Sequence, residues 1–309
     1  MKIFQNISVL KTALLISALP LSMLLLGKDA GRLVQIVSMD PAYSHIMVIP
    51  FISAFFLWRG RKSFLSEKGN KIGLVFALCA VAGVFILNLF QIGESVSLTL
   101  KVTGVIVAIS GLFVSFWGWT GLKKSLFSFI FLLLAIPIPP GVLNSIVGFL
   151  QWGSAVMVDF LYLVVGQSYL RDGNEFHLDT ISIFIAPECS GIRSTMALII
   201  TGAVAVELYL KRWPLKVFMI ALIIPLSLLK NAIRIFTITM LAQHINQSFL
   251  TDSFLHHSGG VVFYLIVLAI FFPLLLVLSK IENRATLSPV SASDGSKPTQ
   301  KTIDNNVAR

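Results

Sequence analysis

Long apolar runs are the feature that most constrains the fold of this chain. Stretches of 18 or more mostly apolar residues recur along it, and each is long enough to cross the hydrocarbon core of a bilayer, about 30 Å thick, as a helix. Only 12% of the 309 residues are charged, whereas soluble domains carry about 25%. The sequence therefore predicts an all-α, polytopic membrane protein and not a soluble globular domain.

We expect a bundle of about eight transmembrane helices plus one interfacial helix. The predicted spans are 8–27, 43–58, 73–92, 98–119, 125–145, 190–210, 215–242 and 259–279. Residues 285–309 are rich in Ser, Thr, Asp, Asn and Lys, so we expect them to form a disordered cytoplasmic tail. The transmembrane domain then comprises residues 1–284.

The positions of Lys and Arg orient these spans. The formal net charge is +10, but the basic residues gather in short loops between apolar runs, so they indicate membrane orientation and we expect no nucleic-acid partner. The expected cytoplasmic loops are 59–72, 120–124 and 211–216, and the expected outer loops are 28–42, 93–97, 167–188 and 243–258. The loop 28–42 is an exception to the rule, because it carries Lys28 and Arg32 on the outer side.

The stretch 141–166 is apolar but contains three polar residues, Asn144, Gln151 and Asp159. The loop assignment requires an odd number of crossings between 120–124 and 167–188, and we assign a single crossing to 125–145. The stretch 141–166 is then expected at the outer interface as an amphipathic or re-entrant helix. The prolines that should separate the two pieces are Pro137, Pro139 and Pro140. The polar connection that follows contains the alternating sequence ISIFIA, which predicts a short strand.

The unusual polar residues of the chain gather near the outer leaflet. Cys189 precedes the span 190–210 on its outer side. Arg234 lies in the sequence KNAIRI near the outer end of the next span, and Asn231 lies on the same helix face one turn deeper. His256 and His257 directly precede the last span. Because successive segments usually pack together, we expect these residues to converge.

This set of residues suits a cysteine acyl-transfer site. A thiol attacks carbonyl groups as thiolate, and a helix N-terminus or a nearby cation such as Arg234 lowers its pKa. A histidine can take the thiol proton and return it to a leaving amine, and an arginine can stabilise the oxyanion of the tetrahedral intermediate. Arg193, four residues after Cys189, either pairs with Glu188 or lowers the thiol pKa. The two cysteines of the chain have no metal-ligand spacing, so we expect no metal and no cofactor.

Each of these residues has a simpler explanation when taken alone. A lone cysteine is usually a small buried apolar residue. An arginine near an interface can reach lipid phosphate, and a histidine at a loop end can simply be exposed. Their joint placement on one side of the membrane favours the catalytic interpretation.

Three motifs resemble the exosortase/archaeosortase family of membrane cysteine transpeptidases. They are PECSGIRS (187–194), NAIRI about 40 residues later, and HHSGG before the last apolar run. The sequence MDPAYSHIMVIPFISAFFLW (39–58) is similar to the family's DPxYSHG segment, although Ile46 follows His45 where the family often has glycine, and AIPIPPGVLN (135–144) is similar to its proline-rich element. The resemblance covers most of residues 39–279.

The resemblance implies specific roles for these residues. Cys189 corresponds to the nucleophile and Arg234 to the family arginine, and His256 is the matching base because it precedes Gly260 by four residues. His257 is an alternative base. The remaining residues expected to support the site are Asn231, Arg193, Glu188, Ser190, Tyr43 and His45.

The resemblance also implies a substrate and a location. Exosortases cleave exported proteins at a C-terminal sorting signal, which consists of a PEP-type (PEP-CTERM) motif, one transmembrane helix and a basic cluster, and are thought to transfer them to a surface acceptor. The expected location is the bacterial inner membrane, with membrane lipid around the protein and the active site facing the periplasm. The acceptor, and the choice between hydrolysis and transpeptidation, stay open.

Three other functions remain open at this point. A transporter would carry ionisable residues at mid-depth in several spans. A membrane enzyme of polysaccharide assembly would need carboxylates at the outer face, and the candidates are Asp172, Glu175, Asp179 and Glu188. A structural membrane partner without chemistry is the third.

Overall fold

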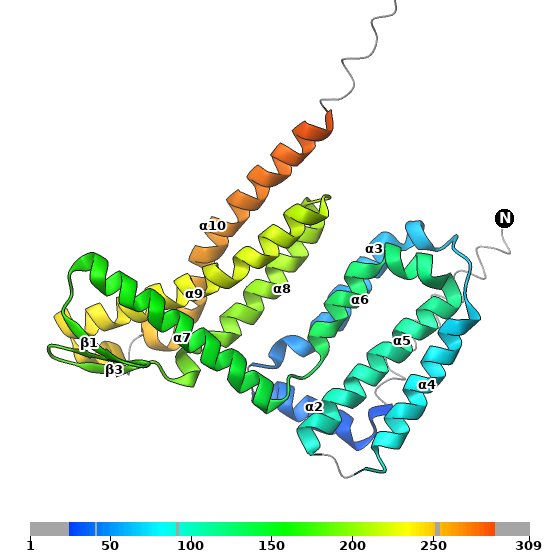
Figure 1. The fold of residues 1–309 in the computed structure, drawn as a ribbon, viewed down its shortest axis with the longest axis horizontal. Coiled ribbons are helices and arrows are strands. Elements are labelled where there is room, and N and C mark those ends of the chain that lie inside the picture. Colours follow the sequence, from blue (N-terminus) through cyan, green and yellow to red (C-terminus); the bar gives the residue numbers. More distant parts are fainter. Residues whose placement is uncertain (1–24, 41, 91–92, 251–253, 288–309) are drawn as a thin grey trace, which may run out of the picture.

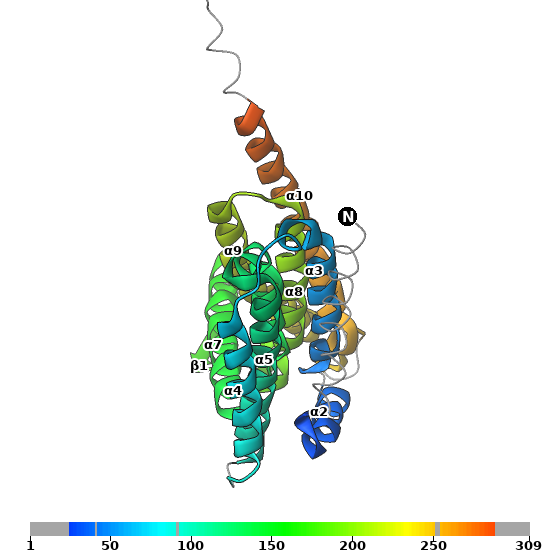
Figure 2. The same ribbon diagram turned by 90° about the vertical axis from the view of Figure 1, so that its right-hand side faces the viewer.

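The computed structural model describes residues 25–40, 42–90, 93–250 and 254–287, and for 250, 254–259 and 285–287 the backbone alone. The predicted span 8–27 lies outside these residues except for its last three, and the predicted tail lies outside them beyond Leu287. The described chain is mostly helical (Figures 1 and 2). The helices are α2 (Lys28–Met39), α3 (Ile49–Phe64), α4 (Lys71–Leu87), α5 (Glu94–Lys124), α6 (Leu126–Leu132), α7 (Pro140–Val165), α8 (Ile192–Tyr209), α9 (Trp213–His244) and α10 (Phe254–Leu287).

The predicted helical membrane bundle is confirmed, but the described residues contain fewer long helices than the predicted spans within them. Within the described residues, five helical segments are long and apolar enough to cross a membrane. They are Glu94–Lys124, Pro140–Val165, Pro187–Tyr209, Trp213–His244 and Gly260–Arg284. The predicted spans 43–58, 73–92 and 125–145 correspond to shorter helices, because local signals end them early. A turn at Ser44–Met47 delays α3, α4 ends at Leu87, where Asn88 donates to the carbonyl oxygen of Val84, and α6 with its 3-10 extension ends at Ala135, just before Pro137.

Small residues allow α4 and α5 to pack closely. A Cβ atom added at Gly73 would lie 2.6 Å from the carbonyl oxygen of Gly111, and one added at Gly111 would lie 2.7 Å from the backbone nitrogen of Ala77. Close backbone approach through glycine and alanine is typical of helix pairs in membranes. α2, α3, α5 and α6 share a further apolar core, and three partly buried residues of α8 (Ile200, Ala203 and Val204) pack against it, which joins the two halves of the molecule.

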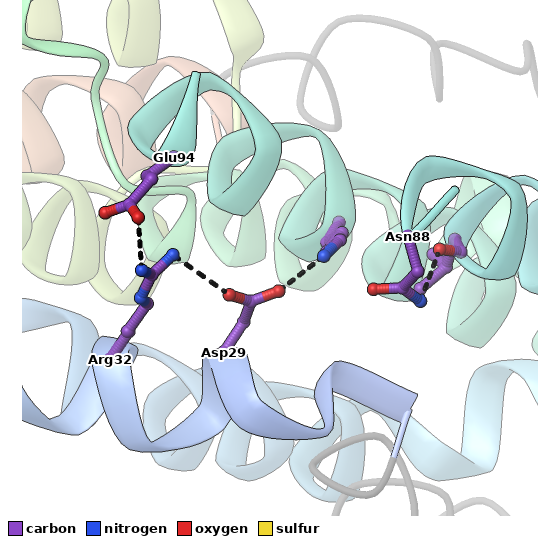
Figure 3. Close-up of polar contacts among 6 residues, drawn as sticks. Asp29, Arg32, Asn88 and Glu94 are labelled. Atoms are coloured by element: carbon purple, nitrogen blue, oxygen red, sulfur yellow. Dashed lines mark hydrogen bonds and ion pairs between the residues drawn. The ribbon is translucent and has the colours of Figure 1, made fainter. Parts of the chain in front are cut away.

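An ion-pair network joins the N-terminal turns of α2 and α5 (Figure 3). Lys101, which is only 5% exposed, donates to the Asp29 carboxylate at 2.5 Å. Arg32 pairs with Glu94 at 2.5 Å and lies 3.7 Å from Asp29. The charge of Arg32 is therefore balanced by carboxylates.

The region between α5 and the sheet differs from its predicted boundaries. The chain is extended at Ile136 and Pro139, and α7 starts at Pro140, so the predicted proline break is confirmed but the helix predicted over 125–145 is wrong. α7 has 26 residues and is one of the five helices long enough to cross. In Figure 1 it runs across the direction followed by α3, α6 and α8, an orientation that suits the expected interfacial helix.

A small antiparallel sheet packs against α7 and α9. Its strands are β1 (Tyr169–Asp172), β2 (Glu175–Leu178) and β3 (Ser182–Phe184), in the order β1-β2-β3, with Phe176 opposite Ile183. The strand predicted from ISIFIA is β3, whereas β1 and β2 are additions to the all-α prediction. Phe176 is fully buried against Tyr162 of α7 in a core that also includes Ala232 of α9.

The polar residues of α7 hold this sheet in place. Gln151 donates to the carbonyl oxygen of Ile185 at 2.8 Å, directly after β3. Asp159 accepts a hydrogen bond from Tyr169 and lies 3.4 Å from the Arg171 guanidinium. These contacts satisfy polar groups that interrupt an otherwise apolar helix, and they fix the chain that leads to Cys189.

Candidate active site

Cys189 lies in a single 3-10 turn, Pro187–Ser190, between β3 and α8. Its backbone nitrogen donates to Ala186 at 2.8 Å. The next residue but one, Gly191, has a φ of 78° and caps the start of α8. A Cβ atom at Gly191 would lie 2.9 Å from the side-chain oxygen of Asn231, so both the left-handed backbone and the contact with α9 favour glycine. The thiol-bearing turn therefore ends in the predicted way, at the N-terminus of a helix.

Asn231 of α9 holds the backbone of this turn. Its amide nitrogen donates to the carbonyl oxygen of Cys189 at 2.8 Å and to the hydroxyl of Ser154 in α7 at 3.0 Å. Asn231 is 2% exposed and Ser154 is fully buried. The two hydrogens of one amide group thus connect the cysteine turn with two helices.

A pocket of about 250 Å³ opens beside the cysteine. Cys189 and Arg234 both line it, so the structure brings together two of the three residues predicted to be catalytic. The other lining residues come from β3, the residue after it and α9, and they are mostly apolar: Ser182, Ile183, Phe184, Ile185, Ile235, Ile238 and Thr239. Charged groups act more strongly on a reacting carbonyl in such apolar surroundings than in water.

The predicted histidines lie at the start of α10. His256 and His257 follow Phe254, where this helix begins, which is earlier than the predicted span at 259. Their side chains lie outside the described residues. The choice between His256 and His257 as the base therefore stays a prediction.

The other predicted residues take different positions around the turn. Glu188 and Arg193 are both exposed, and no ion pair joins them in the described part of the chain. The Ser190 hydroxyl is buried without a hydrogen-bond partner among the described residues. Tyr43 donates to the carbonyl oxygen of Ile138 at 2.8 Å, before α3. His45 and Arg193 line a separate pocket.

Sequence reasoning missed Lys230. This lysine is 3% exposed, and its ammonium group donates to the hydroxyl of Ser194 in the first turn of α8. The same hydroxyl donates to the carbonyl oxygen of Gly191 at 3.1 Å, so Lys230 supports the end of the cysteine turn. The signal was its position in KNAIRI, since a charged residue inside an apolar run is rare and usually functional.

The four carboxylates considered for polysaccharide assembly lie outside the Cys189 pocket. Asp172, Asp179 and Glu188 are exposed, and none of the four candidate carboxylates lines the Cys189 pocket. No cluster of three or more His, Cys, Asp or Glu residues that could hold a metal occurs in the described ranges.

A family model for transmembrane exosortases matches residues 37–273 of the chain. The matched region contains the cysteine turn, Arg234 and both histidines. The chain belongs to the transmembrane exosortase family. The search of curated proteins and the search of solved structures each returned no match. Family membership confirms the resemblance inferred from the three motifs, and with the five long apolar helices it makes this exosortase a multi-pass membrane protein.

Proposed function

We propose that this exosortase is a membrane cysteine protease or transpeptidase that cleaves C-terminal sorting signals of exported proteins at the outer face of the bacterial inner membrane. The observation that supports it best is the pocket that Cys189 and Arg234 share, next to a helix N-terminus. A thiol, a fixed cation and apolar walls form a suitable environment for attack on a peptide carbonyl.

The reaction has two halves. The Cys189 thiolate attacks the carbonyl carbon of the scissile bond, and the Arg234 guanidinium stabilises the oxyanion of the tetrahedral intermediate. His256 holds the thiol proton and gives it to the amine of the leaving signal, so the C–N bond breaks and a thioester forms. A second nucleophile, an amine of the surface acceptor or water, then attacks the thioester, loses its proton and releases the thiolate.

The substrate's own helix fits the proposed topology. A sorting signal consists of a motif, one transmembrane helix and a basic cluster that stays in the cytoplasm. The motif then lies at the outer leaflet, on the side to which the Lys and Arg pattern assigns Cys189. The partners are exported proteins with such a signal and an acceptor at the cell surface.

Trapping the acyl-enzyme tests this proposal. The full-length protein is co-expressed with a tagged exported protein that carries a candidate sorting signal. We expect a hydroxylamine-sensitive thioester on the peptide that contains Cys189. Cys189→Ala should abolish processing, and Cys189→Ser should nearly do so, because a hydroxyl is a far weaker nucleophile at neutral pH.

Cys79 provides the matched control. It is exposed on α4, away from the Cys189 pocket, so Cys79→Ala should process the substrate normally. Normal processing by Cys189→Ala would end the cysteine mechanism. His256→Ala should be far more damaging than His257→Ala, and the reverse order would move the base to His257.

A further inference from the structure

A second pocket lies beside the cysteine turn, between segments about 150 residues apart in the sequence. Its volume is about 330 Å³. The lining residues are Ala42, Ser44 and His45 from the turn before α3, and Arg193, Met196 and Ala197 from the first turns of α8. It shares no lining residue with the Cys189 pocket, and Arg193 follows Cys189 by only four residues. The segment 189–193, which joins the cysteine turn to α8, therefore lines one pocket at its first residue and the other pocket at its last.

The chemistry of this second pocket is that of an anion site with apolar walls. Arg193 is exposed at α8's first turn, permanently charged, and forms no ion pair with any carboxylate in the described ranges. Burial lowers the pKa of His45, against opposing hydrogen bonds with the backbone of Ala42 and Leu134, so the imidazole is neutral at pH 7. His45 then adds no second positive charge, and its single ring N–H is used by a backbone carbonyl, so the charged donor of the pocket is Arg193. The remaining walls, at Ala42, Met196 and Ala197, suit methylene groups.

We propose that the pocket between His45 and Arg193 binds an acidic side chain of the sorting signal, within a few residues of the bond that Cys189 attacks. The inference rests on the proposed function. A guanidinium binds a carboxylate through two parallel hydrogen bonds, and an Asp or Glu side chain brings methylenes that contact the apolar walls. A lipid phosphate suits the pocket less well, because phosphate sites usually supply several charged or backbone donors.

Steady-state kinetics in vesicles test this inference, with the full-length protein and a signal peptide that contains one acidic residue in its motif. Arg193→Gln should raise KM roughly 10- to 100-fold, the range expected for a lost hydrogen bond to a charged group, and leave kcat nearly unchanged. Replacing the acidic residue of the peptide by its amide should have the same effect on the wild-type protein. The two changes together should cost no more than either one, because both remove the same contact. Lys28→Gln, which removes another exposed outer-side cation, is the control for general attraction and should leave KM unchanged.

Three results would overturn the inference. The first is a KM effect of Arg193→Gln that is equal for the acidic and the amide peptide. The second is full additivity of the two changes. The third is a KM effect that disappears in vesicles without anionic lipid, which would assign Arg193 to a lipid headgroup.

Binding of the same peptides to the Cys189→Ala protein separates this inference from the proposed function. One outcome is tight binding that depends on Arg193 and on the acidic residue, with no cleavage by the wild-type protein. This outcome would support the pocket assignment and contradict the proposed reaction. Cleavage by the wild-type protein with no dependence on Arg193 would do the opposite. Absence of binding would end both.

Discussion

At Arg234, stabilisation of an oxyanion and attachment to lipid make different demands on the side chain. The oxyanion role needs the planar guanidinium beside Cys189, in the pocket that both residues line. We expect Arg234→Lys to lower kcat by about 10²- to 10³-fold, the loss typical of removing an oxyanion donor. Initial rates of signal cleavage in vesicles measure it. If lysine supports nearly normal rates, Arg234 only contacts phosphate.

Asn231 connects the backbone of the cysteine turn to α7 and α9. Asn231→Leu has a similar size but leaves the carbonyl of Cys189 and the hydroxyl of Ser154 without their donor. We expect the free energy of unfolding to fall by about 1–3 kcal/mol for each buried group, and processing to fall with it. Denaturant unfolding in detergent measures the stability. Asn144→Leu, at an exposed asparagine of α7, is the control and should change stability by less than about 0.5 kcal/mol.

At the scale of residues, chemistry could be predicted from the sequence better than contacts. Cys189 and Arg234 stand out because thiol and guanidinium groups are unusual in apolar runs, and they do line one pocket. The role of Lys230 could not be predicted, because its contact with Ser194 depends on how α8 and α9 pack. That His45 and Arg193 line one pocket depends in the same way on packing between distant segments.

At the scale of elements, a buried ion pair between Asp29 and Lys101 joins α2 to α5. Removing one partner alone should destabilise the protein much more than removing both. Lys101→Met removes the buried cation of the Asp29 carboxylate, which is 13% exposed, and leaves it only the more distant Arg32 guanidinium at 3.7 Å. We expect a loss of about 3–5 kcal/mol in the free energy of unfolding, the usual result of breaking a buried pair from one side. The double variant Asp29→Leu/Lys101→Met should recover most of it. Equal stability of the single variant and the wild type in denaturant unfolding would show that the pair is not buried in the membrane-embedded protein.

Element boundaries were predicted well only where a side chain forces them. Three prolines predict the break before α7, and the chain is extended there. The hairpin of β1 and β2 was missed, although Asp172-Gly173 is a turn signal and Gly173 has a φ of 59°. The strands are only four residues long and carry mixed polar and apolar residues, so they give no clear periodic pattern.

For the whole molecule, the Lys and Arg pattern makes a prediction that labelling can test. In a protein without its two native cysteines, we expect a membrane-impermeant maleimide added from outside to label Ser248→Cys but not Ser66→Cys. Both positions are exposed, in η4 (Gln247–Leu250) and in the loop after α3. In permeabilised cells the reagent should label both positions, which would show that both introduced thiols can react. Labelling of Ser66→Cys alone from outside would invert the topology and put the Cys189 pocket in the cytoplasm.

The fold class could be predicted from hydropathy, but the count of long helices could not. Apolar composition predicts which segments enter the bilayer, and five of the described helices are long and apolar enough to cross it. Helix length depends also on caps and turns, such as Asn88 after α4 and the turn at Ser44–Met47, and these shorten helices inside apolar runs. Three predicted spans are short for that reason, and they pack beside α5 or α3 instead of standing alone.

The exposed position of Cys79 on α4 has a practical consequence for counting active protein. The chain has two thiols, one on an apolar helix surface that faces outward and one in the pocket beside Arg234. A charged thiol reagent does not dissolve in hydrocarbon, so its reaction should be limited to Cys189, whereas an apolar reagent should reach both. The ratio of the two labels then gives the fraction of molecules with a competent nucleophile, an active-site titration that needs no substitution in the chain.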